Sequence, residues 1–433
     1  MKERHGERSM KIENVMERVY QRRRLNRAWQ QVEKNAGAAG VDQMTVENFA
    51  TRKSELLDLI HAKLETGTYR FKPARRVLIP KPGTTKKRKL GIPVVMDRVV
   101  SQSLYTVLEE IYDPDFTKSN FGFRRGKSQH QAVEHLRQAV AEGNEWCTSV
   151  DLKSFFDEIP HGLILKLIRR KIRDEQLVTL IARALKAGVM VDGKLEKTTK
   201  GCPQGSPVSP ILSNIVLNEL DHELERRGHR YCRWADDFAI VVKSERAAKR
   251  VMTSITKYLE AELGLPVNRE KSLVAPPQKV GFCSFNILRG KIRISTSAKE
   301  RFKDQVRRLT TRNNGWSMFQ VIQSLNEYLE GWVGYFQLQE FQTTFRKLDE
   351  FIRSRLRSMQ LKKWKKPKKF QRMMIRLGFP VEEARRTWIK MDAWRSAHRL
   401  IVKYVLNLKW FRRQGLLSLD KYTQRTLKLP FDR

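Results

Sequence analysis

Cysteine is scarce in this sequence, with 4 residues among 433, and each of them stands alone. No CxxC pair occurs, and the cysteines and histidines form no cluster of four with the spacing of a zinc site. The sequence therefore indicates neither a disulfide framework nor a zinc finger, and it is typical of a reducing compartment. The four residues are Cys147, Cys202, Cys232 and Cys283.

Long apolar runs are also missing. The opening segment MKERHGERSMKIENV contains no apolar stretch of the kind found in signal peptides. No other segment reaches the length of a membrane-spanning helix. We therefore expect a cytoplasmic protein with no membrane partner.

Negative charge is the third shortage. The chain has 47 Asp and Glu residues against 86 Lys and Arg, which gives a formal net charge of +39. A field of this sign and size attracts polyanions, and nucleic acid is the leading candidate. The alternative is a solvated basic surface that keeps the protein soluble.

The length of 433 residues predicts two or three packed units. Residues 1–68 show helical spacing of apolar positions, and residues 69–295 mix short strands with helices. The strands include a basic hairpin within 71–95 and an apolar run at 147–152. Beyond about residue 296 the strand signals end and basic amphipathic helices follow. These patterns predict an α+β protein with a helical C-terminal part.

The segment HRYCRWADDFAIVVKS, residues 229–244, predicts a β-hairpin with Asp236 and Asp237 at its turn. Neighbouring side chains on a strand point to opposite faces, but at a tight turn both can address one site. Asp is also common in turns because it makes local hydrogen bonds, so the pair alone leaves both interpretations open.

Asp151 follows the apolar strand and provides a third carboxylate. An acid at the end of a buried strand is costly unless something compensates its charge, and a cation is one such partner. The alternative is a helix N-cap. If this strand lies beside the hairpin, three carboxylates converge, and a set of this kind suits Mg²⁺. Two such ions, about 3.5–4 Å apart, activate a 3′-hydroxyl and stabilise leaving pyrophosphate.

The segments SVDLKSFFD, GCPQGSPVSPILSNIVLNELD and RWADDFAIVV occur in the order and approximate spacing of reverse-transcriptase palm motifs. They resemble the group II intron reverse transcriptases, or maturases. The segment LIPKPGTTKKRKLGIPVV resembles the finger region of that family, and GWVGYFQLQ and NLKWFRRQGLLSL resemble its thumb. The likeness spans about residues 11–419.

The resemblance implies a right-hand polymerase, with fingers and a palm whose antiparallel sheet packs on helices, followed by an all-α thumb or maturase domain. The implied domains are an N-terminal basic helical extension (1–68), fingers and palm (69–295), a thumb and maturase domain (296–400), and the end of the thumb with a short basic tail (401–433). No cysteine follows Cys283, so we expect no C-terminal endonuclease domain.

The resemblance also implies roles for individual residues. Catalysis and metal binding are implied for the three aspartates, with Leu152 completing the metal site. Phe156 stands where the family has an aromatic gate against a 2′-hydroxyl, although a core role is the alternative, above all for its neighbour Phe155. The implied nucleotide-binding residues are Lys81, Arg88, Phe155, Phe156, Gln204 and Lys271.

Template and primer contacts are implied for Arg75, Trp234, Lys365 and Lys366. Trp234 departs from the family, which usually has tyrosine before ADD, and we expect the change to alter primer positioning. The aromatic residues of the C-terminal helices, Trp364, Phe370, Trp394 and Trp410, can stack on bases, but helical spacing favours a core role for most of them.

The implied function is RNA-directed DNA synthesis by two-metal nucleotidyl transfer, together with binding of intron RNA for splicing and mobility. The cofactor is Mg²⁺, two ions, with Mn²⁺ as a substitute. The partners are an RNA template that includes intron RNA, a DNA primer and deoxynucleoside triphosphates. The alternatives are a related enzyme repurposed for phage defence or DNA repair, and a maturase that only assists splicing.

Overall fold

The computed structural model describes residues 11–80, 87–313, 315–364, 366–386 and 393–421. The chain divides into two compact units, Met1–Cys283 and Ser284–Arg433. The first unit mixes helices with two four-stranded sheets, and the described part of the second is helical apart from one hairpin. The predicted α+β class is therefore confirmed, while the finer division into four domains stays a prediction.

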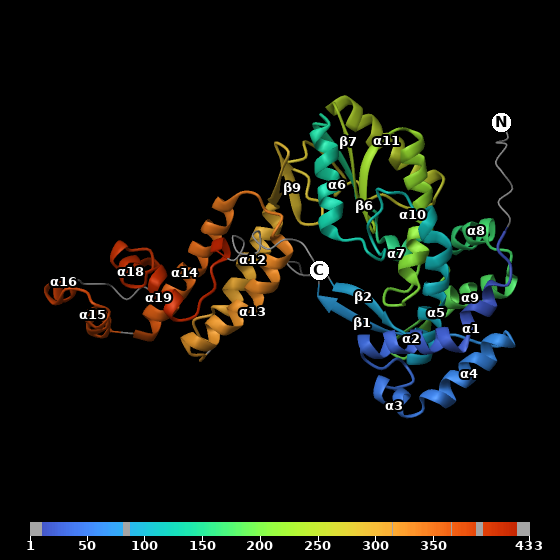
Figure 1. Ribbon diagram of the computed structural model, residues 1–433, viewed down its shortest axis with the longest axis horizontal. Helices are drawn as coiled ribbons and strands as arrows, with labels where there is room; N and C mark the ends of the chain where they lie inside the picture. Colours follow the sequence, from blue (N-terminus) through green and yellow to red (C-terminus); the bar gives the residue numbers. More distant parts are fainter. Residues whose placement is uncertain (1–10, 81–86, 314, 365, 387–392, 422–433) are drawn as a thin grey trace. The chain divides into compact units, whose positions relative to one another are not determined.

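The helices of the first unit appear in blue to yellow-green in Figure 1. They are α1 (Val15–Tyr20), α2 (Arg22–Asn35), α3 (Val46–Thr51), α4 (Lys53–Glu65), α5 (Val95–Tyr112), the 3₁₀ turn Asp113–Asp115, α6 (Gln129–Ala141), α7 (Phe155–Glu158), α8 (His161–Lys171), α9 (Glu175–Lys186), α10 (Ser209–Arg226) and α11 (Glu245–Ala261). Thr45 caps α3 by accepting a hydrogen bond from the Asn48 amide. Helix α6 was not predicted.

The palm sheet has the strand order β6-β7-β3-β8, and all its neighbouring strands are antiparallel. Its strands are β3 (Trp146–Val150), β6 (Arg230–Trp234), β7 (Asp237–Val242) and β8 (Leu273–Ala275). The predicted hairpin and the predicted strand before Asp151 are confirmed. Helices α10 and α11 pack on one face of this sheet, and Thr148 of β3 donates a 3.0 Å hydrogen bond to the Ala248 carbonyl of α11.

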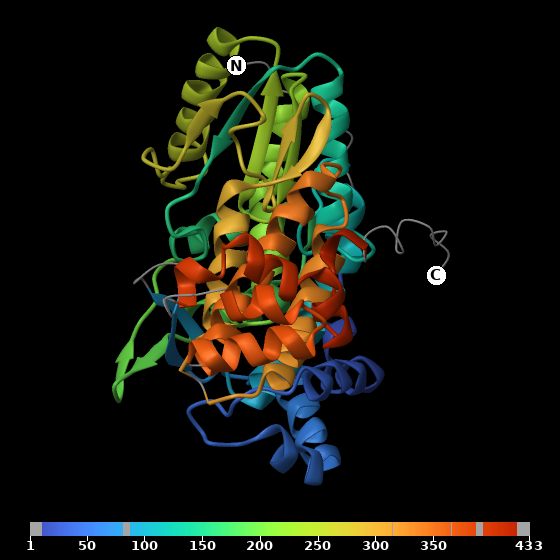
Figure 2. The same cartoon turned by 90° about the vertical axis from the view of Figure 1, so that its left-hand side faces the viewer.

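The finger sheet has the order β2-β1-β4-β5, with strands β1 (Ala74–Pro80), β2 (Lys87–Ile92), β4 (Val189–Val191) and β5 (Lys194–Glu196). The predicted β1–β2 hairpin is confirmed. The β4–β5 hairpin was not predicted, because the sequence before it continues the helical pattern of α9. Gly188 ends that pattern with φ +79°, and a Cβ there would lie 2.8 Å from the Glu196 carbonyl. Figure 2 shows the β4–β5 hairpin projecting at the lower left.

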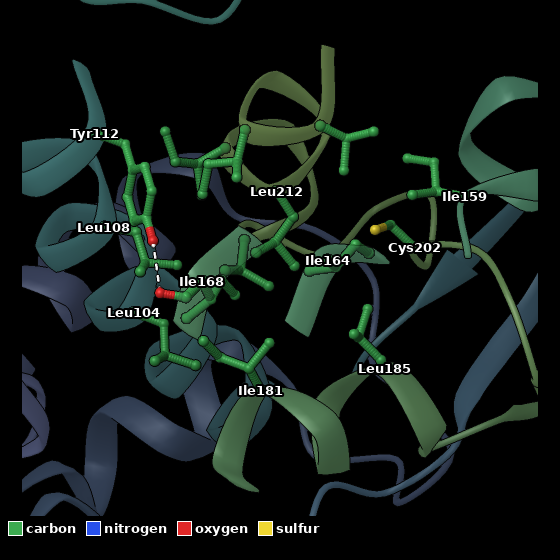
Figure 3. Packing of buried hydrophobic residues seen from close by; sticks show 14 of the residues in the cluster. Leu104, Leu108, Tyr112, Ile159, Ile164, Ile168, Ile181, Leu185, Cys202 and Leu212 are labelled. Atoms are coloured by element: carbon green, nitrogen blue, oxygen red, sulfur yellow. Dashed lines mark hydrogen bonds between the residues drawn. The ribbon is translucent and has the colours of Figure 1, made fainter. Parts of the chain in front are cut away.

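The hydrophobic core of the first unit includes side chains of helices α5, α8, α9 and α10 (Figure 3). Leu104, Leu108 and Ile168 are fully buried there, and the Tyr112 hydroxyl donates to the Ile168 carbonyl at 3.2 Å. Cys202, which lies just before the PQG sequence, is buried in the same core. Packing therefore fixes the loop that follows Cys202 against four helices.

The second unit contains the hairpin β9 (Phe285–Leu288) and β10 (Lys291–Ile294), then α12 (Thr296–Leu309), α13 (Met318–Phe336), α14 (Gln342–Trp364), α15 (Pro367–Arg376), α16 (Val381–Arg386), α17 (Ala393–Ser396), α18 (Leu400–Val405) and α19 (Leu408–Arg413). Ser317 and Gln320 form a capping box at the start of α13. No helix among the described residues is both long enough and apolar enough to cross a membrane.

Aromatic side chains form the core of the second unit. Trp332 lies 4.4 Å from Phe302 and 4.5 Å from Phe336, measured between ring centroids. The predicted core role is confirmed for Trp364 and Phe370, which are buried and lie 5.5 Å apart. Trp410 is half-buried, and the side chain of Trp394 lies outside the described residues.

Candidate active site

The two adjacent aspartates lie at the β6–β7 turn. Trp234 pairs with Asp237, which leaves only Ala235 and Asp236 to make the turn. Ala235 has φ 57°, the left-handed conformation that a tight hairpin requires. Asp237 alternates with Phe238, whose face packs on α10 and α11, so Asp237 lies on the opposite face of the sheet. Helix α6 covers part of that opposite face, where Cys232 Sγ donates to the Ala132 carbonyl at 3.1 Å.

Asp151 stands at the end of the neighbouring strand. Val150 of β3 pairs with Phe238 of β7, so the next residues along the two antiparallel strands, Asp151 and Asp237, lie opposite each other. The Asp151 amide donates to Ser272 Oγ at 3.1 Å. Lys271 Nζ lies 3.8 Å from Asp151 Oδ1, and the Asp151 side chain is 40% exposed. The sheet register therefore brings the three predicted carboxylates to one place.

The carboxylates influence one another's ionisation. Burial raises the pKa of Asp237 to about 7, the Cys283 amide lowers it by hydrogen bonding, and the charges of Asp236 and Asp151 raise it further. Burial is also the main cause that raises the pKa of Asp236, while Arg88 and Arg233 act in the opposite direction. The turn is therefore a site of concentrated negative charge that a cation would relieve.

The donor set fits a divalent metal ion. Carboxylate oxygens are the ligands preferred by hard cations, and a bound ion offsets both the burial and the mutual repulsion of the carboxylates. Among the residues that the structure describes, no three His, Cys, Asp or Glu side chains are yet close enough to hold one ion together.

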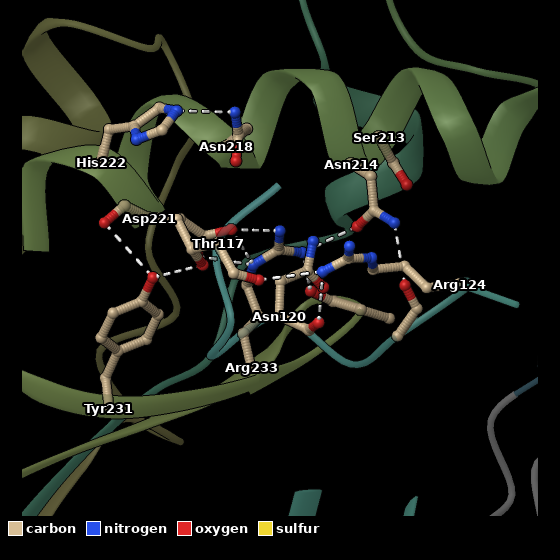
Figure 4. A network of polar contacts seen from close by, with 12 residues as sticks. Thr117, Asn120, Arg124, Ser213, Asn214, Asn218, Asp221, His222, Tyr231 and Arg233 are labelled. Atoms are coloured by element: carbon tan, nitrogen blue, oxygen red, sulfur yellow. Dashed lines mark hydrogen bonds and ion pairs between the residues drawn. The ribbon is translucent and has the colours of Figure 1, made fainter. Parts of the chain in front are cut away.

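A buried polar network between β6 and α10 supports the turn (Figure 4). Arg233 has no exposed side-chain surface, and neither has its partner Asp221 of α10. Arg233 Nε donates to both Asp221 oxygens at 2.9 and 3.0 Å, and Nη1 donates to Asn214 Oδ1 at 2.9 Å. The same Nη1 donates to the Ala235 carbonyl at 3.0 Å. A helix side chain and a strand side chain together therefore fix the backbone of the aspartate turn.

Helix α7 and the PQG loop form the second wall of the site. Phe155 is buried in the core, while Phe156 is half-buried, and their ring centroids lie 5.4 Å apart. The Phe156 carbonyl accepts the Cys202 amide at 2.7 Å, and the Gln204 carbonyl accepts the Gly91 amide of β2 at 2.7 Å. The PQG loop therefore joins α7 to the finger sheet.

A pocket of about 280 Å³ lies where these elements meet. Gln204 lines it together with three basic residues of the finger sheet and the PQG loop. Its charged lining residues are Arg76, Lys89, Lys200, Asp157 and Glu158. Lys200 forms an ion pair with Glu158, and Arg76 approaches Glu196 at 4.0 Å. Lys89, the third basic residue of the pocket, forms no ion pair with a carboxylate of the described residues.

The remaining predicted binding residues are more scattered. Arg88 is exposed on β2, while Lys81 and Lys365 lie outside the described residues. Arg75 donates from Nε and Nη2 to the Ala39 carbonyl at 3.1 and 2.8 Å, so its guanidinium holds the N-terminal segment. Lys366 is exposed at the start of α15. Trp234 shares the face of Asp237, because the two residues pair across the hairpin.

The buried network has a signal in the sequence. Tyr231 and Arg233 alternate onto the inner face of a strand, and a buried arginine requires a partner. Asn214 and Asp221 are separated by seven residues on α10, which places them on one side of that helix. The Cys283 amide gave no such signal, because backbone donors leave no trace in residue type.

Comparisons with known families agree with this geometry. Residues 79–287 match the family described as reverse transcriptase (RNA-dependent DNA polymerase), and residues 299–377 match the group II intron maturase-specific domain. This chain belongs to the group II intron reverse transcriptase and maturase family. It is an RNA-directed DNA polymerase of that family, and enzymes with this domain depend on divalent metal ions.

Individual relatives show how far the likeness extends. Protein YkfC of Escherichia coli is 32% identical over 279 residues, which cover 56% of this chain and 73% of YkfC. The group II intron-encoded protein LtrA of Lactococcus lactis is 37% identical over 196 residues, 45% of this chain, but the match spans only 32% of LtrA. A telomerase structure from Candida tropicalis matches with 13% identity and a TM-score of 0.42, covering 52% of this chain and 55% of the telomerase.

Proposed function

We propose that this reverse transcriptase extends a DNA primer on an RNA template with deoxynucleoside triphosphates, and that it binds intron RNA to assist splicing and mobility. The observation that supports the polymerase site most directly is the register that sets Asp151 opposite Asp237, with Asp236 at the adjoining turn. Metal binding by Asp151, Asp236 and Asp237, completed by Leu152, follows as the proposed arrangement.

Two Mg²⁺ ions are the proposed cofactors, with Mn²⁺ as a substitute, and when bound they supply the charge that activates a 3′-hydroxyl and stabilises pyrophosphate. The protein residues perform the positioning. Arg233 holds the Ala235 carbonyl and thereby the aspartate turn. The Cys283 amide orients the Asp237 carboxylate. Phosphoryl transfer of this type depends on positioning and charge neutralisation more than on a protein nucleophile.

Several residues are proposed to hold the incoming nucleotide. The charge of Arg88 lowers the pKa of Asp236, which supports a role for this guanidinium in holding the triphosphate. Lys81 belongs to the same proposed finger group. Phe156 is proposed to exclude a 2′-hydroxyl with support from Phe155, and Gln204 to line the nucleotide pocket. Lys271, 3.8 Å from Asp151, is proposed to donate a proton to departing pyrophosphate.

Template and intron RNA are proposed to bind along basic surfaces, including Arg75, Lys365 and Lys366, through phosphate contacts that do not read sequence. The net charge of +39 supports this role. Trp234 is proposed to lie beneath the primer terminus, because it shares the face of Asp237. We place the protein in the cytoplasm of a bacterium, associated with RNA or the nucleoid.

Primer extension on an RNA template with Mg²⁺ tests the polymerase assignment. Asp236→Asn should abolish extension, while filter binding shows unchanged affinity for the template–primer duplex. Asp304→Asn is a matched control, because Asp304 is an exposed aspartate of α12 in the second unit. An inert wild-type enzyme, or equal loss in both variants, contradicts the proposal.

A splicing assay separates the two activities. Intron RNA should splice with the Asp236→Asn protein as it does with the wild type, because the RNA-binding surfaces are intact. A protein that splices but never extends a primer would instead be a splicing-only maturase. Extension without any effect on intron splicing would favour an enzyme repurposed for defence or repair.

A further inference from the structure

The segment Phe121–Gly122–Phe123 lies between the aspartate turn and the proposed sugar gate. The Phe121 amide donates to the Arg233 carbonyl at 2.9 Å, and the Arg233 amide donates to the Ser119 carbonyl at 2.9 Å. On its other side, the Phe123 ring meets the Phe156 ring edge to face, with centroids 6.3 Å apart and planes at 74°. One short loop therefore contacts both parts of the site.

Gly122 sets the distance between this loop and the turn. A Cβ at this position would lie 2.1 Å from the Ala235 nitrogen and 2.9 Å from its Cα, which no side chain can do without moving the turn. Asn214 of the buried network donates to the Gly122 carbonyl at 2.8 Å. The loop and the turn are thus held to the same asparagine and arginine pair.

Phe123 occupies an unfavourable backbone conformation. Its φ of 57° lies in the left-handed region, where a bulky residue is uncommon. Its side chain remains 39% exposed, so burial does not account for the ring at this position. Arg124 holds the strained backbone by donating to Asp113 Oδ1 at 2.6 Å and to the Thr117 carbonyl at 2.9 Å. Strain maintained in this way is typical of functional sites.

The Phe156 ring has two aromatic neighbours. Phe155 is buried, with its ring at 5.4 Å and 63°, and Phe123 is 39% exposed, with its ring at 6.3 Å and 74°. Removing the Phe123 ring therefore takes away one of the two aromatic contacts that restrict the orientation of Phe156.

We propose that Phe123 is a specificity-determining positioning residue, whose ring holds Phe156 in the orientation that excludes the 2′-hydroxyl of a ribonucleotide. This inference rests on the proposed role of Phe156 as the sugar gate. Phe123 acts through Phe156, and Gly122 provides the close contact that keeps both rings at a fixed distance from the aspartate turn.

The test is single-nucleotide insertion opposite one template base, with kcat/KM measured for the deoxynucleotide and for the matching ribonucleotide. Phe123→Asn removes the ring but keeps a residue that tolerates the left-handed backbone. We expect discrimination against the ribonucleotide to fall by about two- to tenfold, as the energy of an aromatic pair predicts, because ribonucleotide insertion becomes faster. Phe123→Tyr retains the ring and should retain discrimination.

A double variant identifies the route of the effect. In a Phe156→Ala background, adding Phe123→Asn should cause no further loss of discrimination, because the gate is already absent. Unchanged discrimination in Phe123→Asn alone, or an equal loss of insertion for both nucleotides, overturns the role of Phe123. Unchanged discrimination in Phe156→Ala overturns the gate itself, and this inference with it. If the asparagine variant does not fold, Phe123→Leu gives the same comparison.

Discussion

Replacement of Arg233 by methionine should separate the stability of the palm from the geometry of its aspartate turn. Arg233 and Asp221 are both fully buried. Arg233→Met leaves the Asp221 carboxylate without its ion pair and removes the hydrogen bond to the Ala235 carbonyl. Breaking a buried pair in this way costs about 3–5 kcal/mol. That loss is a large share of the about 5–15 kcal/mol that stabilises an ordinary domain.

The double variant Arg233→Met, Asp221→Leu supplies the decisive comparison. Replacing both charges by apolar groups is often neutral or stabilising, so most of the lost stability should return. The hydrogen bond to the Ala235 carbonyl does not return, because methionine has no donor. We therefore expect a folded protein whose primer extension remains at least about tenfold below the wild type, the equivalent of one lost hydrogen bond of about 1.4 kcal/mol.

Urea unfolding followed by circular dichroism measures the first quantity, and primer extension on an RNA template measures the second. A single variant that loses less than about 1 kcal/mol would show that the pair does not stabilise the palm as its burial requires. A double variant with full extension activity would show that Arg233 stabilises the fold without positioning the turn.

Three further predictions concern other parts of the first unit. Gly122→Ala should lower primer extension and cost about 1–3 kcal/mol, because the added Cβ lies 2.1 Å from the Ala235 nitrogen. Gly162→Ala, within α8 and with open space around it, is its matched control. Burial raises the pKa of Asp97 from 3.8 to about 7, so the folded state keeps a proton that the unfolded chain releases. Relative to Asp97→Asn, the wild type should lose up to about 4 kcal/mol of unfolding free energy, in urea titrations, as the pH rises from 4 to 7. Trp234→Tyr should keep primer extension but change the KM for the primer or the error rate, because the residue shares the face of Asp237.

Each of these has a contrary outcome. Equal activity in Gly122→Ala and Gly162→Ala would mean that the turn yields to the added methyl group. A difference between Asp97→Asn and the wild type that is constant with pH would mean that Asp97 ionises in the folded protein as it does in the unfolded chain. An inert wild type that gains activity as Trp234→Tyr would mark Trp234 as the sign of a decayed or repurposed site.

The sequence predicted the elements whose pattern is local. The strand before Asp151 and the hairpin around Asp236 follow from apolar runs and a turn of two residues, and both are present. The convergence of the aspartates was conditional on strand pairing, which periodicity does not specify. The β4–β5 hairpin was missed because a helical pattern continued up to Gly188.

The site itself was only partly predictable. Residue type revealed the carboxylates, but the Cys283 amide acts through its backbone, and any residue can supply such a donor. Arg75 shows that the partners of a side chain are also hard to predict. It was predicted to contact the template, and in the structure its guanidinium donates to the Ala39 carbonyl. The template contact stays a prediction, and the hydrogen bond to Ala39 could not be predicted, because residue type does not show which backbone carbonyl an arginine will reach.

The N-terminal segment is part of the folding unit of the polymerase, which limits how far the chain can be shortened. Ile12 is hydrogen-bonded on both sides to the chain at the end of α8. Its amide donates to the Lys171 carbonyl and its carbonyl accepts from the Arg173 amide, each at 2.9 Å. The Ser103 hydroxyl of α5 donates to the Val19 carbonyl at 2.6 Å. The reverse transcriptase similarity starts at residue 79, but the folding unit starts much earlier. A fragment trimmed to the similar region would uncover the apolar side of α5. We expect such a fragment to aggregate and to show no polymerase activity.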